Sequence, residues 1–159
     1  TRPDARFVIV GGGRMMEKAK ELAEQLKLAD RLLFVGHSKA VGYWYGKMDV
    51  KLLMSRFEGL PNVLIEAQYL GCPVVSTPAG GAAECFVSGE TGYILNSAEH
   101  PDLELACRYI RELVDGRRAN PEALPKAAMK TAKSFSPKNM MKNFRAICRA
   151  PVMQGAAET

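Results

Sequence analysis

No apolar run in this 159-residue sequence approaches the roughly 18 residues that a helix needs to cross a bilayer. The chain also opens on Thr-Arg-Pro-Asp, without the basic and apolar regions of a secretory signal peptide. Hydrophobic residues make up 47% and charged residues 25%, which is ordinary for a globular protein. We therefore expect a cytoplasmic protein with one substantial core.

Metal-binding patterns are equally scarce. The two histidines are isolated, and no two of the four cysteines are close enough to form a C-x-x-C pair. The cysteines are Cys72, Cys85, Cys107 and Cys148. The sequence therefore predicts no metal site, and we expect reduced thiols, as in the cytosol.

Basic residues modestly outnumber acidic ones, which gives a formal net charge of +5. This excess suits an anionic ligand such as a diphosphate, or attraction to acidic lipids. The basic residues are scattered and are not interleaved with aromatics, so no nucleic acid is expected as a partner. The predicted C-terminal helices contain several lysines, which form either a solvated face or a surface attracted to anionic lipid. They are Lys126, Lys130, Lys133, Lys138 and Lys142.

Short apolar, β-branched runs alternate with stretches of helical periodicity. Strands are predicted at residues 6–10, 31–35, 50–54, 74–77 and 92–95. Helices are predicted at 15–28, around 43–45, and at 61–70, 83–87, 101–114, 121–134 and 137–150. The alternation indicates an α/β fold with a Rossmann-like parallel sheet and helices on both faces. We expect one domain over residues 1–150 and a disordered tail over 151–159.

The stretch from residue 55 to residue 92 contains the most informative residues. In a parallel sheet, ligands bind at the carboxyl ends of the strands, and Glu58 follows the third predicted strand. The helix after it offers the N–H groups of Asn62, Val63 and Leu64, together with the positive end of its dipole. This helix start is a suitable seat for a diphosphate.

Two further features lie close to that seat in the sequence. Glu66 is one helical turn beyond Asn62 and Val63, where a carboxylate can accept hydrogen bonds from two adjacent ribose hydroxyls. Gly80 and Gly81 follow the fourth predicted strand, and glycines there let a backbone approach a ligand closely. By contrast, Gly11-Gly12-Gly13 lacks the third glycine of a dinucleotide fingerprint.

Glu58 and Glu66 are separated by seven residues, which is the E-x7-E signature of retaining GT-B glycosyltransferases. The chain resembles glycosyltransferase family 4 over roughly residues 7–135. The resemblance is carried by the segments EGLPNVLIEA, GCPVVSTPAGGAAE and GETGYIL, in that order. The resemblance implies that the chain is the C-terminal, donor-binding half of a GT-B fold.

The resemblance also implies a role for individual residues. Glu58, the catalytic residue, would contact the donor sugar beside its anomeric carbon, and Glu66 would hold the ribose. The other implied donor-binding positions are the amides of Asn62, Val63 and Leu64, the backbone of Gly36, His37 and Ser38 at the nucleobase, Gly11 and Gly12 in the cleft, and Gly80 and Gly81.

The implied reaction is transfer of a sugar, with retained anomeric configuration, from a nucleotide-diphosphate donor to a growing glycan or glycolipid. No metal or other cofactor is expected, since the family does not require one and the sequence contains no D-x-D pair. Two alternatives remain: another GT-B sugar-nucleotide enzyme such as an epimerase, or a non-catalytic sugar-nucleotide-binding module.

The family also implies segments that this sequence does not contain. Its members carry an Arg and a Lys in a strand–helix unit that would precede Thr1, and an N-terminal GT-B domain before that. We therefore expect a domain truncated on its N-terminal side, inactive alone, from an enzyme of polysaccharide or glycolipid biosynthesis. Peripheral contact with the inner face of an anionic membrane would suit such an acceptor.

Overall fold

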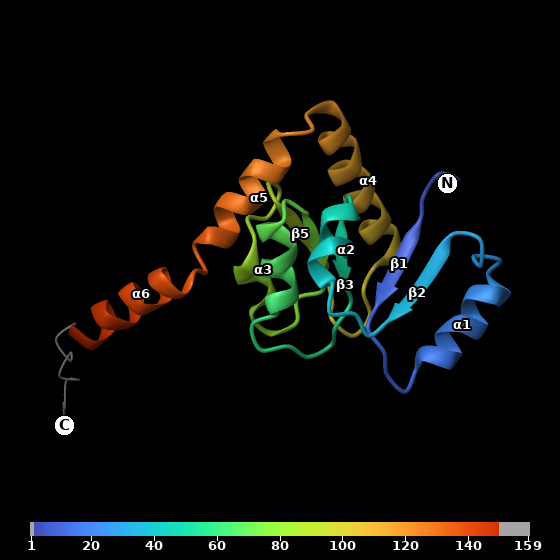
Figure 1. Ribbon diagram of the computed structural model, residues 1–159, viewed down its shortest axis with the longest axis horizontal. Helices are drawn as coiled ribbons and strands as arrows, with labels where there is room; N and C mark the ends of the chain where they lie inside the picture. Colours follow the sequence, from blue (N-terminus) through green and yellow to red (C-terminus); the bar gives the residue numbers. More distant parts are fainter. Residues whose placement is uncertain (1, 150–159) are drawn as a thin grey trace, which may run out of the picture. The chain divides into compact units, whose positions relative to one another are not determined.

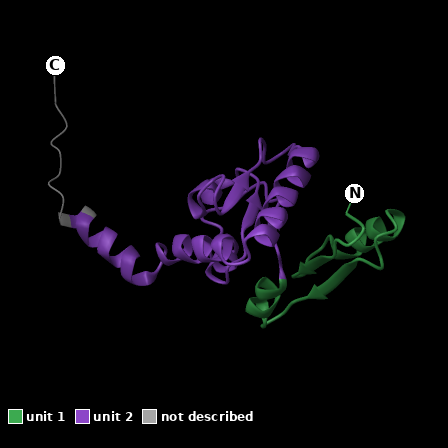
Figure 2. Ribbon diagram, turned by 90° about the horizontal axis from the view of Figure 1, so that it is seen from above, with its two compact units in different colours: residues 1–47 green, residues 48–159 purple. Residues whose placement is uncertain are grey.

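The computed structural model describes residues 2–149, except the side chains of residues 147 and 149, and it divides into two compact units. Unit 1 is Thr1–Lys47 and unit 2 is Met48–Thr159, coloured separately in Figure 2. The predicted tail at 151–159 lies outside the described residues.

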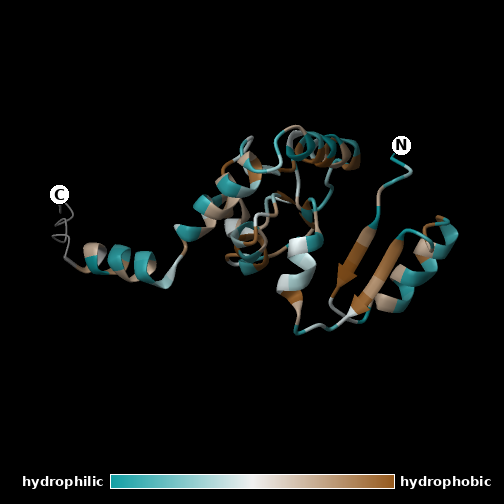
Figure 3. Ribbon diagram, turned by 45° about the horizontal axis from the view of Figure 1, so that its top comes forward, coloured by the Kyte–Doolittle hydropathy of each residue, from teal (hydrophilic) through white to brown (hydrophobic). Residues whose placement is uncertain are grey.

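Unit 1 is a β-α-β unit followed by one short helix. Its elements are β1 (Phe7–Val10), α1 (Met16–Gln25), β2 (Leu32–Gly36) and α2 (Val41–Lys47). β1 and β2 pair in parallel, with Phe7 opposite Leu32 and Ile9 opposite Phe34. Both strands are strongly apolar, as the brown ribbons of Figure 3 show, and α1 makes the crossover that a parallel pair requires.

Unit 2 contains the larger sheet. Its elements are β3 (Lys51–Leu53), α3 (Asn62–Tyr69), β4 (Val74–Ser76), the 3₁₀ helix η1 (Gly80–Cys85), β5 (Gly92–Ile94), α4 (Leu103–Ala119), α5 (Ala123–Lys133) and α6 (Pro137–Arg149). The strand order is β3-β4-β5, all parallel (Figure 1). β4 is therefore the central strand, and all three of its residues are buried.

Helical segments cover both faces of this sheet. Val75 belongs to a buried cluster that includes Ala106 and Leu113 of α4. Val74 points to the opposite face, because successive side chains of a strand alternate. On that face its methyl group and the ring of Phe86, just after η1, both lie within 3 Å of the position that a Cβ on Gly92 would take. α3 packs on β3, β4 and η1, so the central strand is enclosed by helix on either side.

The predicted α/β class, the parallel pairing and the covering helices are confirmed, but the strand arrangement differs in one respect. The sequence predicts one parallel sheet, whereas the hydrogen bonds form a β1-β2 sheet and a β3-β4-β5 sheet. The alternation of strands and helices predicts βα units, but it carries no signal for which strand lies beside which.

Several helix boundaries also differ from the prediction. α1 ends at Gln25 rather than at residue 28, and α4 runs to Ala119 rather than to residue 114, with Gly116 inside the helix. The helix predicted at residues 83–87 is a 3₁₀ helix over Gly80–Cys85. No helix in the described part of the chain is long and apolar enough to cross a membrane.

Candidate functional site

The carboxyl ends of β3 and β4 lie at the same edge of the unit 2 sheet, because the strands are parallel neighbours with Leu53 opposite Ser76. The chain leaves β3 through the loop that carries Glu58 and leaves β4 through the segment that carries Gly80 and Gly81. Two of the predicted groups therefore start from adjacent positions on one sheet edge.

The two loops are in direct contact. The Gly81 N–H donates to the Gly59 carbonyl oxygen at 2.7 Å. Gly80 has a φ of +52°, and a Cβ built there would overlap the carbonyl oxygen of Glu58. The structure thus brings Glu58, Gly80 and Gly81 together, although the neighbour that approaches the glycines is the chain's own loop.

The start of α3 provides a candidate anion seat next to these loops. Pro61 precedes the helix with φ −74° and ψ 94°, and no side chain caps the helix. The Leu64 N–H donates to the Pro61 carbonyl at 3.0 Å, so it is already occupied in this tightened first turn. Among the described residues, the Asn62 and Val63 amides have no recorded acceptor and remain the candidate donors.

Glu66 shares the outward side of α3 with Asn62. The helix buries Leu64, Ala67 and Gln68, while Asn62 and Glu66, four residues apart, are both exposed. The Glu66 carboxylate therefore lies one turn from the helix start, on its solvent side, where it can meet groups attached to an anion bound at that start. Glu58, in the preceding loop, is half-buried.

The remaining predicted residues form a second group, within unit 1. The Gly11 N–H donates to the Gly36 carbonyl at 2.7 Å. A Cβ at Gly12 would lie 2.8 Å from Nε2 of His37. The hydroxyl of Ser38 accepts from the Ala40 amide at 3.1 Å and shapes the turn after β2. The carboxyl ends of β1 and β2 therefore gather these positions.

Three buried residues near the unit 2 loops were not singled out in the sequence. The hydroxyl of Thr77 donates to the Ser55 carbonyl oxygen at 2.5 Å, and Nε2 of Gln68 donates to the Cys85 carbonyl at 2.5 Å. Burial and the neighbouring Glu84 charge raise the pKa of the Cys85 thiol to about 11. The available signal was the presence of polar residues within otherwise apolar stretches.

No group of three or more His, Cys, Asp or Glu residues in the described part of the chain is placed to hold a metal ion. The polar groups near the strand ends include backbone amides, carboxylates and hydroxyls. Amides and hydroxyls can donate to a diphosphate, and carboxylates can accept from sugar hydroxyls.

A parallel sheet enclosed by helices, with glycine-bearing loops and a helix start at its carboxyl edge, defines a Rossmann-like α/β class of domain. The sequence places the chain more specifically, because residues 1–131 match the model of the family Glycosyl transferases group 1. The chain belongs to the group 1 glycosyltransferases.

Two curated relatives are named for the biosynthesis of a polysaccharide and of a lipopolysaccharide core. Over 113 residues the chain is 57% identical to the Vi polysaccharide biosynthesis protein VipC/TviE of Salmonella typhi, covering 71% of this chain and 20% of that protein. Over 142 residues it is 31% identical to the lipopolysaccharide core biosynthesis mannosyltransferase LpsB of Rhizobium meliloti (strain 1021), covering 85% and 40%. The chain thus spans between a fifth and two-fifths of these relatives.

Among solved structures, the fold resembles that of HepE from Anabaena, determined in complex with UDP-glucose. The TM-score is 0.76 and the sequences are 22% identical, over 92% of this chain and 41% of that one. The GT-B glycosyltransferase fold is thereby supported, and the chain is a group 1 glycosyltransferase domain. The epimerase and non-catalytic alternatives are not favoured, since the relatives are named as biosynthetic proteins or transferases.

Proposed function

We propose that this chain is the donor-binding part of a retaining, family 4 glycosyltransferase of polysaccharide or glycolipid biosynthesis. The observation that carries the proposal is the meeting of the Glu58 loop, the Gly80–Gly81 pair and the start of α3 at one sheet edge. The E-x7-E spacing of Glu58 and Glu66 supports it.

In the proposed binding mode, the donor diphosphate lies at the start of α3. The Asn62 and Val63 amides donate to it, and the helix dipole favours its charge. The carboxylate of Glu66 accepts from the ribose hydroxyls, and Glu58 lies beside the anomeric carbon. The backbone at Gly36, His37 and Ser38 reads the nucleobase, and Gly11 and Gly12 line the cleft where donor and acceptor meet.

The proposed reaction forms one bond and breaks one bond at the anomeric carbon. The acceptor hydroxyl oxygen bonds to that carbon on the face from which the diphosphate oxygen departs, so configuration is retained. The acceptor proton passes to the departing diphosphate. The α3 amides stabilise the charge that develops on the leaving group, and Glu58 stabilises the positive charge on the sugar.

The donor site is proposed to need no metal and to be completed by other parts of the parent protein. The relatives are much longer than this chain. The remainder would supply the acceptor-binding N-terminal domain and cationic groups for the diphosphate. The isolated chain would then bind a nucleoside diphosphate weakly and transfer no sugar.

The proposal is tested with the full-length parent protein and a panel of UDP-, GDP- and ADP-sugars, with release of the nucleoside diphosphate as the readout. We expect one donor to be used, at the same rate with and without EDTA, and NMR of the product to show the anomeric configuration of the donor. Inverted product would contradict retention, and loss of activity in EDTA would contradict the metal-free site.

A further inference from the structure

We propose that Thr77 and Gly80 are positioning residues that fix the Glu58 loop against the segment after β4. The inference rests on the proposed function for the role of Glu58. It assigns the glycine pair a task different from the ligand approach that the sequence indicated.

The first link is a buried hydrogen bond at the root of the loop. Thr77 is fully buried, and its hydroxyl donates to the Ser55 carbonyl oxygen at 2.5 Å. The Thr77 N–H donates to the Leu53 carbonyl at 3.0 Å, which extends the β3–β4 ladder by one step. One residue thus ties down the backbone on both sides of Met54, where β3 ends and the loop begins.

The second link is made further along the loop, on either side of the peptide that follows Glu58. The Gly81 N–H bonds the Gly59 carbonyl at 2.7 Å. The Glu58 carbonyl lies so close to the Cα of Gly80 that no side chain fits there. The φ of +52° at Gly80 also belongs to the left-handed region that favours glycine. Two independent reasons therefore exclude any other residue at position 80.

The segment after β4 is itself anchored on α3. Nε2 of Gln68 donates to the Cys85 carbonyl at the end of η1, at 2.5 Å. Gln68 is fully buried in the same helix that begins with the proposed diphosphate donors. The Glu58 loop, the glycine pair and α3 are thus connected by hydrogen bonds from side chains and backbone to carbonyl oxygens, and by close packing. Displacing the segment after β4 would displace Glu58 relative to the α3 amides.

The chemistry explains why such a clamp is needed. Glu58 lies in a loop without regular structure between β3 and α3, so the sheet alone does not fix it. A misplacement of about 1 Å at a reacting group can cost about a hundredfold in rate. A buried hydroxyl-to-carbonyl bond is a rigid tether, since breaking it leaves the carbonyl unpaired.

The test uses the full-length parent with Thr77→Val, which removes the hydroxyl and keeps the shape. We expect kcat to fall by about tenfold or more, while the dissociation constant of the nucleoside diphosphate that binds best among UDP, GDP and ADP changes less than about threefold. Thr77→Ser should restore kcat. Hydrogen exchange should accelerate in peptides that cover residues 54–61.

A matched control is available in the same unit. Thr91 is also fully buried, and its hydroxyl accepts from the Val87 amide at 3.1 Å, away from the Glu58 loop. Thr91→Val should lower stability without accelerating exchange in residues 54–61. Gly81→Ala is the second variant if Thr77→Val does not fold, because its Cβ would lie 3.1 Å from the Gly59 carbonyl oxygen and displace the loop only slightly. It should reproduce the loss of kcat.

A double-mutant cycle separates this inference from the proposed function. If Thr77 acts through Glu58, Thr77→Val should lower kcat far less in a Glu58→Gln background than in the wild type. Equal effects in the two backgrounds, or unchanged exchange at residues 54–61 in Thr77→Val, would overturn the clamp. Full activity in Glu58→Gln alone would instead overturn the proposed function, and the exchange measurement would still decide the clamp.

Discussion

At the scale of single residues, Glu58 is the position where the proposed chemistry depends on one side chain. This residue is half-buried, in a loop whose backbone is bonded at two points to the segment after β4. A fixed charge beside a carbon that becomes positive stabilises the transition state more than the ground state. Glu58 should therefore affect turnover more than donor binding.

The prediction for Glu58→Gln in the full-length parent is a fall in kcat of about a hundredfold with little change in donor KM. The substitution keeps the shape of the side chain and removes its charge. Steady-state kinetics with the donor that the parent uses provide the measurement. Wild-type kcat in this variant would show that Glu58 plays no part in the chemistry.

The buried cysteines allow a prediction about pH. Burial raises the pKa of the Cys72 thiol to about 12 and that of Cys85 to about 11, from an ordinary value of 9.0. Below pH 9.0 both thiols are neutral in the folded and in the unfolded protein, so this contribution to stability is fully present. Above pH 9.0 the thiols ionise first in the unfolded protein, and the stability is lost as pH rises through the pKa values of the folded state. The free energy of unfolding should therefore fall between pH 9 and pH 12.

Chemical denaturation across this range tests the pH dependence, with Cys72→Ala and Cys85→Ala as variants that should reduce it. An alkylating reagent at pH 8 gives a second readout. Since Cys107 and Cys148 are exposed, they should react first, while Cys72 and Cys85 react only on unfolding. Rapid labelling of Cys85 in the native state would contradict the assigned burial.

At the scale of elements, the sequence predicted the type of nearly every helix and strand. It did so because parallel strands read as short apolar runs and their helices as periodic ones. It could not predict that the strands form two ladders, since pairing depends on contacts between distant segments. The clamp between Thr77 and Ser55 was hidden for the same reason, as these residues are 22 positions apart.

In the candidate site, too, local patterns could be predicted from the sequence and hydrogen-bond partners could not. The E-x7-E spacing and the helix start at Asn62 were visible in the sequence, because they are local patterns. The hydrogen bond from the Leu64 amide to the Pro61 carbonyl was not visible in the sequence, because it depends on the tightened first turn of α3. The sequence therefore indicated which loops form the candidate site, and the structure shows which of their amides already have partners.

The N-terminus of α4 gives a prediction about stability. Oδ1 of Asp102 accepts from the Glu104 amide at 2.9 Å and from the Leu105 amide at 3.0 Å, so it caps the helix that covers Val75. Asp102→Ala should lower the free energy of unfolding by about 1 kcal/mol. Urea denaturation measures this change. Asp102→Asn, which retains a capping oxygen, should lose less, and an equal loss in both variants would contradict the cap.

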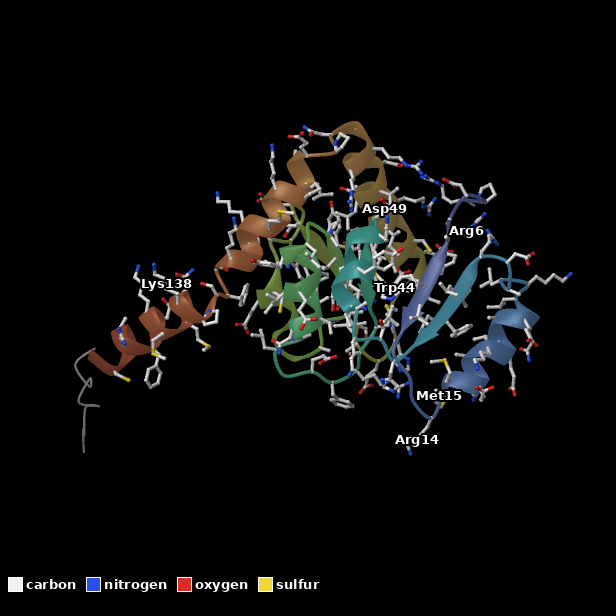
Figure 4. All side chains as sticks on the ribbon, viewed as in Figure 1. Arg6, Arg14, Met15, Trp44, Asp49 and Lys138 are labelled. Atoms are coloured by element: carbon white, nitrogen blue, oxygen red, sulfur yellow. The ribbon has the colours of Figure 1, made fainter. Side chains whose placement is uncertain are left out.

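The last helix, α6, supports a prediction about membranes. Met140, Met141 and Phe144 form an exposed apolar stripe, whereas the basic stripe contains Lys138, Lys142 and Arg145. The helix contains no acidic residue, and the side chain of Lys138 extends outward from it (Figure 4). We expect the parent to sediment with vesicles that contain anionic lipid.

The measurement compares vesicles of phosphatidylcholine alone with vesicles that also contain phosphatidylglycerol. Binding should require the anionic lipid, weaken as salt rises, and fall in a Lys138→Gln/Lys142→Gln variant. A Lys18→Gln/Lys27→Gln variant removes the same charge from exposed positions in unit 1. Equal binding by both variants would contradict a role for α6 in membrane binding. The apolar stripe of α6 would then be assigned to packing against the remainder of the parent protein.

At the scale of the whole molecule, the positive net charge of +5 fits a protein that binds an anionic donor. The family match over residues 1–131 covers unit 1 and most of unit 2, so both units contribute to the glycosyltransferase domain. The chain spans 20% of one relative and 40% of another, so we assign the proposed transfer activity to the full-length parent rather than to this chain. The central claim for this chain is therefore donor binding, through the exposed side of α3.

That claim is tested most directly by calorimetric titration of UDP, GDP and ADP into the full-length parent, its Glu66→Gln variant and a Glu90→Gln variant. Glu90 is exposed in the same unit, at the amino end of β5, and serves as the matched charge control. Losing charge-assisted hydrogen bonds worth about 1.5–3 kcal/mol each should weaken the best nucleotide by about tenfold or more in Glu66→Gln and hardly at all in Glu90→Gln. Equal affinity in all three proteins, or no binding of any nucleotide by the wild type, would contradict the account.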